Sequence, residues 1–305
     1  MAACSLRAKC GYDSADIDVI VKSGDWAMVA KLAALLEQRF GARVDVPPEL
    51  ARLDELIHAA EHRSHRTFRE DPVPDAWVRT LLACALSAPS KSDLQQLCVV
   101  RIEEASQRAA VAALVPTLEW VPSAPLLMIF CGDSRRIRRI CALRERPFAN
   151  DHLDAMFNAS VDAALVMMNF IRVARAAGLG CCPISMVRDR AAELSALLEL
   201  PAGVFPVAGM AAGFPAAEAP LSPRLPLSLT VHTDRYDDSD LEAEVDAYDK
   251  RRNAVQPIAR DAQREIQRYG VEEKYGWSED KARQVSRPAR ADFGRYLRQQ
   301  GFRLD

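Results

Sequence analysis

A short basic stretch, His62-Arg63-Ser64-His65-Arg66-Thr67-Phe68, holds residue types that suit the binding of an anion. Arginine presents a planar fork of hydrogen-bond donors that matches a phosphate group, and the serine hydroxyl adds another donor. The stretch follows an amphipathic helix pattern and precedes a turn with two prolines. Taken alone, such a stretch is usually a solvated basic helix end, and a phosphate site is the alternative.

A second polar stretch, Ser87-Ala88-Pro89-Ser90-Lys91-Ser92, leads through Leu94 and Gln95 into an expected strand. Small hydroxyl residues allow a flat ligand to approach the backbone closely, and they donate hydrogen bonds to it. The pattern fits a ligand-binding loop and an ordinary turn equally well. The eight cysteines contain no CxxC spacing, so we expect no metal site.

Hydrophobic periodicity predicts the elements that must carry these stretches. Helices are expected over residues 26–40, 53–62, 74–86, 108–114, 153–177, 191–198, 241–268 and 291–300, and strands over 15–21, 98–102, 126–131, 181–187 and 204–213. Residues 134–146 carry six arginines. We expect this segment to be a solvated surface, with an anion-binding patch as the alternative.

The helix expected over residues 153–177 is apolar on nearly every side. Such a helix must be buried on most sides, either in a core or in a dimer interface. Asp162 and Asn169 lie inside it, and buried polar groups need hydrogen-bond partners. Its uncharged stretch from Ala163 to Ile171 is far shorter than the roughly 20 residues of a membrane span.

Composition narrows the class of protein. The chain has 305 residues, of which 49% are hydrophobic, and a formal net charge of -2. This charge gives no electrostatic basis for binding nucleic acid or an anionic membrane. Residues 1–13 lack the apolar core of a signal peptide. Because most cysteines lie in apolar runs, we expect a protein with reduced thiols in the cytoplasm.

Taken in order along the chain, the motifs resemble the FMN-dependent nitroreductase family. The marks are Arg63-Ser64-x-Arg66-x-Phe68, Ser92-x-Leu94-Gln95, Gly178-Leu179-Gly180, Gly209-x-x-x-Gly213-x-Pro215 and Pro223-Arg224-Leu225-Pro226. The tail is similar to the group of oxygen-insensitive NADPH nitroreductases and NADPH-flavin oxidoreductases, through Val231-His232, Ala247-Tyr248-Asp249, Trp277-Ser278, Ser286-Arg287-Pro288 and Gln300-Gly301-Phe302. The resemblance predicts an FMN-binding domain over residues 51–305 with an extended C-terminal tail. Residues 1–50 would be an N-terminal appendage.

The resemblance implies an α+β fold, in which helices wrap a central mixed β-sheet, and an interlocked homodimer with FMN at the subunit interface. The implied activity is that of an oxidoreductase that passes electrons from NADPH or NADH to small acceptors such as nitroaromatics, quinones or flavins. The cycle would be ping-pong, with hydride transfer through N5 of FMN. FMN carries this chemistry, so no side chain is expected to be catalytic.

The resemblance also assigns residues to the flavin and its substrates. The FMN phosphate, ribityl chain and pyrimidine edge would be bound by His62, Arg63, Ser64 and Arg66, with Ser222 and Arg224 completing the phosphate clamp. The flavin or substrate side would be lined by Ser90, Ser92 and Gln95. The flavin would be passed by Pro183, Ile184, Ser185 and Met186, which offer a backbone N–H toward N5. Arg287 would reach toward the nicotinamide or the acceptor, as would Ser92.

The sequence differs from the family pattern in a few places. Ser222 stands where a lysine is usual, Ser185-Met186 where two glycines are usual, and Leu118 where a glutamine is usual. The segment before Trp277 is longer than in the family and contains Glu272-Glu273. We therefore expect little discrimination between NADPH and NADH. Two alternatives keep the fold. One is an FMN enzyme for substrate oxidation or reductive dehalogenation, and the other is a non-catalytic flavin-binding protein.

Overall fold

The computed structural model describes residues 25–305, so the strand expected over 15–21 lies outside the described residues. The chain divides into two compact units, each formed by two separate stretches of sequence. We call residues 63–220 with 288–305 the sheet unit, and residues 25–62 with 221–287 the helical unit. Each unit is described by itself.

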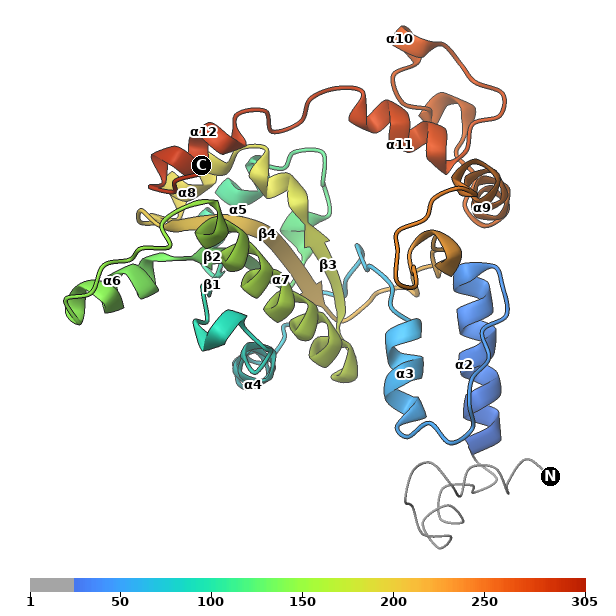
Figure 1. Ribbon diagram of the computed structural model, residues 1–305, viewed down its shortest axis with the longest axis horizontal. Coiled ribbons are helices and arrows are strands. Elements are labelled where there is room, and N and C mark those ends of the chain that lie inside the picture. Colours follow the sequence, from blue (N-terminus) through green and yellow to red (C-terminus); the bar gives the residue numbers. More distant parts are fainter. Residues whose placement is uncertain (1–24) are drawn as a thin grey trace, which may run out of the picture. The chain divides into compact units, whose positions relative to one another are not determined.

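The sheet unit is built on four antiparallel strands in the order β1-β2-β4-β3 (Figure 1). The strands are β1 (Leu97–Arg101), β2 (Leu126–Asp133), β3 (Gly180–Ile184) and β4 (Val204–Gly213). Within the described part of the chain, parallel pairing occurs at one isolated bridge, between Ser64 and Cys181. The expectation of a mixed sheet was therefore wrong, because all three strand pairs of the sheet are antiparallel and this bridge lies outside its four strands.

Helices cover both faces of the sheet. They are α4 (Asp75–Leu86), α5 (Ala105–Ala113), α7 (Leu153–Ala176), α8 (Ala191–Leu197) and α12 (Phe293–Gln299). The unit also contains α6 (Arg135–Leu143), none of whose residues is buried. Alternate residues of β2 point to opposite faces. Met128 and Phe130 join the core that contains Phe170 of α7, whereas Leu127 and Ile129 join a second core on the other face. The expected α+β fold with a helix-covered sheet is confirmed.

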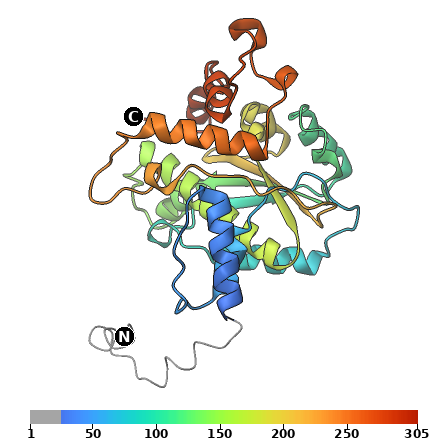
Figure 2. The same cartoon turned by 90° about the vertical axis from the view of Figure 1, so that its right-hand side faces the viewer.

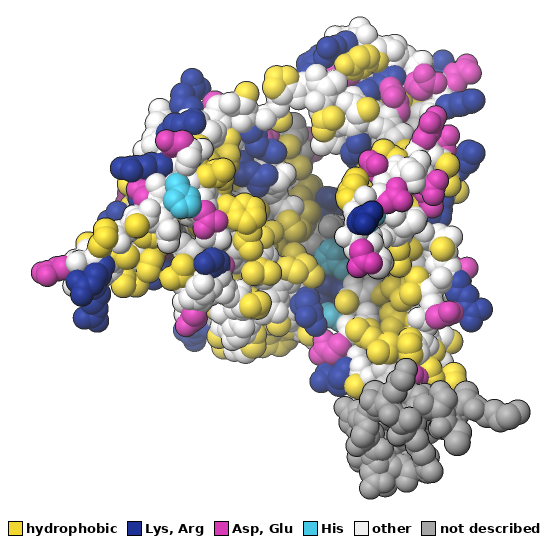
Figure 3. Space-filling model, in the orientation of Figure 1, with side chains coloured by type: hydrophobic (Ala, Val, Ile, Leu, Met, Phe, Trp, Pro, Cys, Tyr) yellow, Lys and Arg dark blue, Asp and Glu magenta, His cyan; other side chains and the backbone are white. Residues whose placement is uncertain are grey.

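Helix α7 buries one face in this core and exposes a stripe of apolar residues on the other. The stripe consists of Leu153, Phe157, Val161, Leu165 and Met168, which lie three or four residues apart and are 37–59% exposed. Figure 3 shows apolar side chains gathered over this helix. By length and composition, α7 is the one helix within residues 25–305 that could also cross a membrane.

The two polar residues inside α7 find partners, as expected. Asp162 is fully buried. Its carboxylate accepts hydrogen bonds from the backbone N–H groups of Lys91 and Gln96, each at 2.9 Å. Asn169 donates to the carbonyl of Cys84, near the end of α4, at 2.9 Å. Helix α7 therefore anchors the serine loop, residues 87–96, close to both of its ends.

The helical unit contains α2 (Asp25–Phe40), α3 (Leu53–Ala60), α9 (Leu241–Val255), α10 (Ile266–Tyr269) and α11 (Trp277–Val285). Leu32 of α2 packs on Leu53 and Ile57 of α3, which lies beside α2 in Figure 1. Lys31 and Glu61 add an ion pair at 2.8 Å. In Figure 2, α9 crosses the C-terminal end of α2. The N-terminal segment is thus packed into a folded unit from Asp25 onward.

The helix expected over residues 241–268 was predicted too long, because α9 ends at Val255. Gln256 leaves the helical conformation, with φ -140° and ψ 73°. The next residue is Pro257, and proline disfavours the α conformation in the residue before it and lacks an N–H of its own. The rest of the expected helix forms the 3₁₀ turn Arg260–Ala262 and the short helix α10.

Candidate active site

The basic stretch is fixed along β3, which is an edge strand of the sheet. Ser64 forms its parallel bridge with Cys181, and the N–H of His65 donates to the Cys181 carbonyl at 3.0 Å. Farther along, the N–H of Arg69 donates to the Phe214 carbonyl at 2.8 Å. The structure therefore brings two predicted site segments together in the sheet unit, residues 63–66 and the strand that continues to Pro183 and Ile184.

The donors of the basic stretch suit an anion. The side chain of Arg63 is only 20% exposed and forms an ion pair at 3.2 Å with the exposed carboxylate of Glu218. The ion pair with Glu218 shows that an anionic group can reach the guanidinium of Arg63 in its present position. Arg66 is exposed, and it lies beside the Cys182 thiol, where it opposes the rise in the thiol pKa that burial causes. The residues present thus fit the phosphate of FMN.

Arg175, in the last turn of α7, is a further cation at this place that the sequence analysis missed. Together with burial, it lowers the pKa of His65. It also opposes the effect of burial on Cys181, which raises the pKa of that thiol to about 12. A basic residue one turn before Gly178-Leu179-Gly180 was a visible signal. Gly180 itself is needed for packing, because a Cβ there would lie 2.6 Å from Cγ of His65.

His65 makes stability depend on pH. Burial, followed by repulsion from Arg175 and Arg63, holds the pKa of His65 below its usual 6.5. Below pH 6.5 the unfolded chain therefore binds a proton that the folded chain does not, so acid favours unfolding. In urea titrations of the flavin-free protein, we expect the free energy of unfolding to fall between pH 7 and pH 5. His65→Gln should reduce this fall, and His232→Gln should not. Equal pH dependence in the parent and His65→Gln would contradict the assignment.

The end of β3 and the turn after it contain the other residues of this sheet edge that were predicted to contact the flavin. Pro183 and Ser185 are exposed, whereas Ile184 is buried in the core. The 3₁₀ turn Ser185–Arg188 begins directly after the strand. Met186 accepts a hydrogen bond from the Thr117 hydroxyl at its sulfur, at 3.3 Å. Pro183 and Ser185 are therefore the accessible residues of this segment.

The serine loop has an unusual backbone for a loop without glycine. Ser92, Asp93 and Gln95 have φ values of 50°, 56° and 50°. Non-glycine residues rarely adopt this left-handed region, and such residues cluster at functional sites. The loop keeps its shape because the Ser90 hydroxyl accepts from the Gln95 N–H at 3.3 Å, and because Asp162 holds two of its N–H groups. It is a fixed structure with its Ser92 and Gln95 side chains exposed.

Within a single copy of the sheet unit, the serine loop and the basic stretch lie apart. The serine loop leads into β1, and the basic stretch lies along β3. These strands are the two opposite edges of the sheet (Figure 1). With neighbouring strands about 4.8 Å apart, the two edges are separated by roughly 14 Å.

The remaining predicted residues belong to the helical unit. The His62 carbonyl accepts a hydrogen bond from Arg39. The guanidinium of Arg224 donates to the Ser222 carbonyl at 3.3 Å, within its own loop. Arg287 pairs with Glu265 at 2.5 Å and keeps 64% of its side chain exposed. Within residues 25–305, no group of three His, Cys, Asp or Glu side chains gathers as metal ligands would.

Comparison with known proteins decides the family. The sequence model of the Nitroreductase family matches residues 59–214, and that of its C-terminal domain matches residues 222–305. The chain belongs to the nitroreductase family. This nitroreductase is 28% identical over 259 residues to FMN reductase [NAD(P)H] of Bacillus subtilis, which covers 83% of this chain and 100% of that protein. It is 34% identical to the oxygen-insensitive NADPH nitroreductase of Salmonella typhimurium over 57% of this chain and 71% of that protein.

Solved structures agree with the family assignment. The hypothetical oxidoreductase YcnD from Bacillus subtilis superposes on this nitroreductase with a TM-score of 0.74 and 27% identity, over 83% of this chain and 99% of that one. The NADPH:FMN oxidoreductase from Vibrio harveyi, complexed with NAD+, gives a TM-score of 0.71 and 26% identity, over 81% and 98%. The expected family and fold are thus confirmed, and the nitroreductase is an oxidoreductase.

Proposed function

We propose that this nitroreductase transfers electrons from NAD(P)H through FMN to nitroaromatics, quinones or free flavin. The observation that carries the proposal is the basic stretch, fixed on the edge of β3 beside the turn at Pro183–Met186. FMN is the cofactor and NAD(P)H the donor, as in the names of its relatives. FMN would supply the chemistry, which is hydride acceptance at N5 and electron delivery to the acceptor. Donor and acceptor would use the same slot in turn.

The protein's own part is to bind and orient. Arg63 and Arg66 would hold the phosphate and the pyrimidine edge of FMN, with Ser64 adding a donor. The segment Pro183–Met186 would pass the flavin ring and offer it a backbone N–H. His62, Ser222 and Arg224 would contribute to the phosphate clamp, a role that rests on their motif positions in the sequence.

Oxidation of NAD(P)H by the FMN-loaded protein tests this function. We measure it with and without menadione, a quinone, and follow the flavin absorbance. Rapid bleaching by NAD(P)H and recovery on addition of the quinone are expected. A flavin that stays oxidised with excess NADH and excess NADPH would contradict the proposal.

Arg66→Ala should weaken FMN binding by about 1–3 kcal/mol, because it removes a charged donor from the phosphate or pyrimidine edge. The dissociation constant is measured by titrating flavin fluorescence. Arg69→Ala is the matched control, since Arg69 is three residues away, is 55% exposed and pairs with Asp71. Equal FMN affinities of Arg66→Ala and the parent would show that the phosphate lies elsewhere.

We infer that the enzyme is a homodimer. The serine loop and the basic stretch lie on opposite edges of one sheet, so a partner subunit would have to supply one of them to a flavin bound at the other. The apolar stripe of α7 is the surface on which two copies could meet, because a contiguous exposed apolar surface marks an interaction site. The site would then be complete only in the dimer.

Nicotinamide choice should be weak. Three arginines of the segment before and around Trp277 have partners within the helical unit. Arg264 pairs with Asp280 at 3.1 Å, Arg287 pairs with Glu265 at 2.5 Å, and Arg268 donates to a backbone carbonyl at 3.3 Å. We therefore expect kcat/KM for NADPH and NADH to agree within about tenfold, or about 1.4 kcal/mol. Stopped-flow reduction of the flavin measures both. A hundredfold preference would reveal a dedicated 2′-phosphate site.

The cysteines suit a reducing compartment such as the cytoplasm. Cys98 and Cys131 are direct partners across β1 and β2. Cysteines placed this close persist as thiols where glutathione and thioredoxin keep them reduced. We propose that the enzyme is soluble and works there.

A further inference from the structure

The end of α2 reaches two segments that are proposed to bind FMN, although it lies outside the region that matches the family. The family match begins at residue 59, whereas Arg39 occupies the last turn of α2. Arg39 is only 5% exposed. A buried guanidinium needs hydrogen-bond partners for its donors, so the identity of its partners shows what it organises.

The guanidinium of Arg39 donates to three backbone carbonyls from two distant segments. Its Nε donates to Ala60 at 2.9 Å, and its Nη2 donates to His62. Its Nη1 donates to Ser222 at 2.8 Å. Because the guanidinium is planar and rigid, it fixes residues 60–62 and the Ser222 loop relative to each other. These segments carry His62 and Arg224, both of which are assigned to the phosphate.

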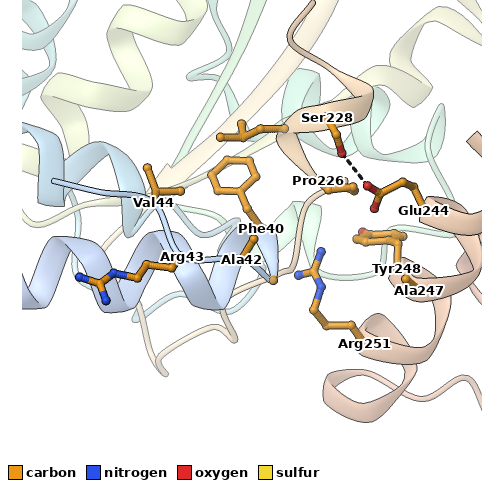
Figure 4. Close-up of a pocket in the computed structure, with 12 residues that line it drawn as sticks. Phe40, Ala42, Arg43, Val44, Pro226, Ser228, Glu244, Ala247, Tyr248 and Arg251 are labelled. Atoms are coloured by element: carbon orange, nitrogen blue, oxygen red, sulfur yellow. Dashed lines mark hydrogen bonds between the residues drawn. The ribbon is translucent and has the colours of Figure 1, made fainter. Parts of the chain in front are cut away.

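The backbone of Arg39 holds the same loop from a second direction. Its carbonyl accepts the N–H of Arg224 at 2.7 Å and Nη1 of Arg251 at 2.8 Å. Nη2 of Arg251 donates in turn to the Arg224 carbonyl at 2.6 Å. Both the N–H and the carbonyl of Arg224 are therefore bound. Figure 4 shows Arg251 reaching from α9 toward the end of α2, beside Tyr248.

Two neighbouring residues, Gly41 and Tyr248, fit the hydrogen bonds made by Arg39 and Arg251. Gly41 has a φ of 77°, and a Cβ on it would lie 2.3 Å from Nε of Arg251, so glycine is required on both grounds. The Tyr248 hydroxyl donates to the Pro223 carbonyl at 3.2 Å. The pocket of about 410 Å³ next to Arg251 (Figure 4) is lined by none of the residues assigned to FMN. The contacts of Arg39, Tyr248 and Arg251 thus converge on the Ser222–Arg224 loop.

We propose that Arg39 is a positioning residue for FMN. It fixes the backbone at His62 and at Arg224, so that the two side chains are held ready for the phosphate before the cofactor arrives. Arg39 itself does not touch the flavin. The inference rests on the proposed function, in which His62 and Arg224 bind FMN. It gives the N-terminal segment, which lies outside the family match, a role in cofactor binding.

The experiment compares Arg39→Ala and Arg39→Lys with the parent and with Arg43→Ala. Arg43 is the matched control, because it follows four residues later and its side chain is 83% exposed. Two quantities are measured, namely the FMN dissociation constant and amide hydrogen exchange of residues 221–226 in the flavin-free protein. Arg39→Ala should raise the dissociation constant at least tenfold and accelerate exchange at Arg224. Arg39→Lys should be intermediate, since one ammonium group cannot match the fork geometry. Arg43→Ala should stay within twofold.

An Arg39→Ala protein that binds FMN within twofold of the parent, with Arg224 exchanging faster, would overturn the inference. If Arg39→Ala does not fold, the variants Arg39→Lys and Arg251→Gln test the inference instead. Both should weaken FMN binding at least threefold while α7 keeps its exchange protection, and unchanged affinity in both would overturn the inference. A different set of results would show that the proposed function itself is wrong. In that case the parent does not bind FMN, or Arg66→Ala and Arg224→Ala bind it as well as the parent does.

Discussion

A protein carrying Phe157→Asp and Leu165→Asp should be a monomer, whereas the parent should be a dimer. Both residues belong to the exposed stripe of α7, with exposures of 59% and 38%. Two substitutions place four carboxylates in each dimer interface, and each unpaired carboxylate costs several kcal/mol when it leaves water. We expect the dimer dissociation constant to rise at least a thousandfold, which corresponds to about 4 kcal/mol. Multi-angle light scattering over a concentration series measures it.

The monomer should also lose FMN, because the serine loop and the basic stretch lie on opposite edges of one sheet. Leu143→Asp is the control. Leu143 ends α6 and is 78% exposed, but it lies outside the stripe. This variant should remain a dimer that binds FMN. A parent protein that scatters as a monomer while holding FMN would refute both the interface and the shared site.

Asp162→Ala should lower the free energy of unfolding by about 3–5 kcal/mol. The carboxylate accepts two backbone N–H groups at 2.9 Å in a fully buried position. Hydrogen bonds to a charged group contribute roughly 1.5–3 kcal/mol each, and removing the acceptor leaves the donors without a partner. Urea denaturation of the flavin-free protein measures the change. The serine loop should also exchange its amide hydrogens faster.

Asp154→Ala is the control for that experiment. Asp154 lies in the first turn of the same helix, and its exposed carboxylate accepts from Asn158 at 2.6 Å. Its loss should cost within about 1 kcal/mol, the scale of an exposed charge near a helix N-terminus. Asp162→Asn keeps the shape but exchanges one acceptor oxygen for a donor, so it should lie between the parent and Asp162→Ala. If Asp162→Ala left the free energy of unfolding and the amide exchange of the serine loop unchanged, the loop would keep its conformation without Asp162.

Local patterns explain what the sequence could predict. Helix α2, helix α7 and strand β4 were predicted to within one residue of their observed ends, because periodic apolar residues and glycine stops mark them directly. The basic stretch was singled out because its residue types suit an anion, and its role at the phosphate stays a prediction. Helix α9 was overextended because the charged sequence continues past Pro257.

The contacts that organise the site depend on partners far away in sequence. Arg39 and Ser222 are 183 positions apart, and Lys91 and Asp162 are 71 apart. No spacing rule links such positions, so the sequence showed that Asp162 needs partners without showing which. The left-handed backbone from Ser92 to Gln95 was also invisible, since no glycine marks it. Arg175 was overlooked although it lies one turn before the Gly178-Leu179-Gly180 motif, because the sequence does not show that it lies near His65.

The link from Arg39 to the loop at Ser222 also constrains the order of events during synthesis. Arg39 leaves the ribosome early, but Ser222 follows 183 residues later. At roughly 5–20 residues per second, the first part of the helical unit waits about 10–40 s for its second part. During that time the sheet unit's strands, which all lie between residues 97 and 213, have already emerged. The helical unit can therefore close only after all four strands have emerged, and the last segment of the sheet unit, residues 288–305, follows it.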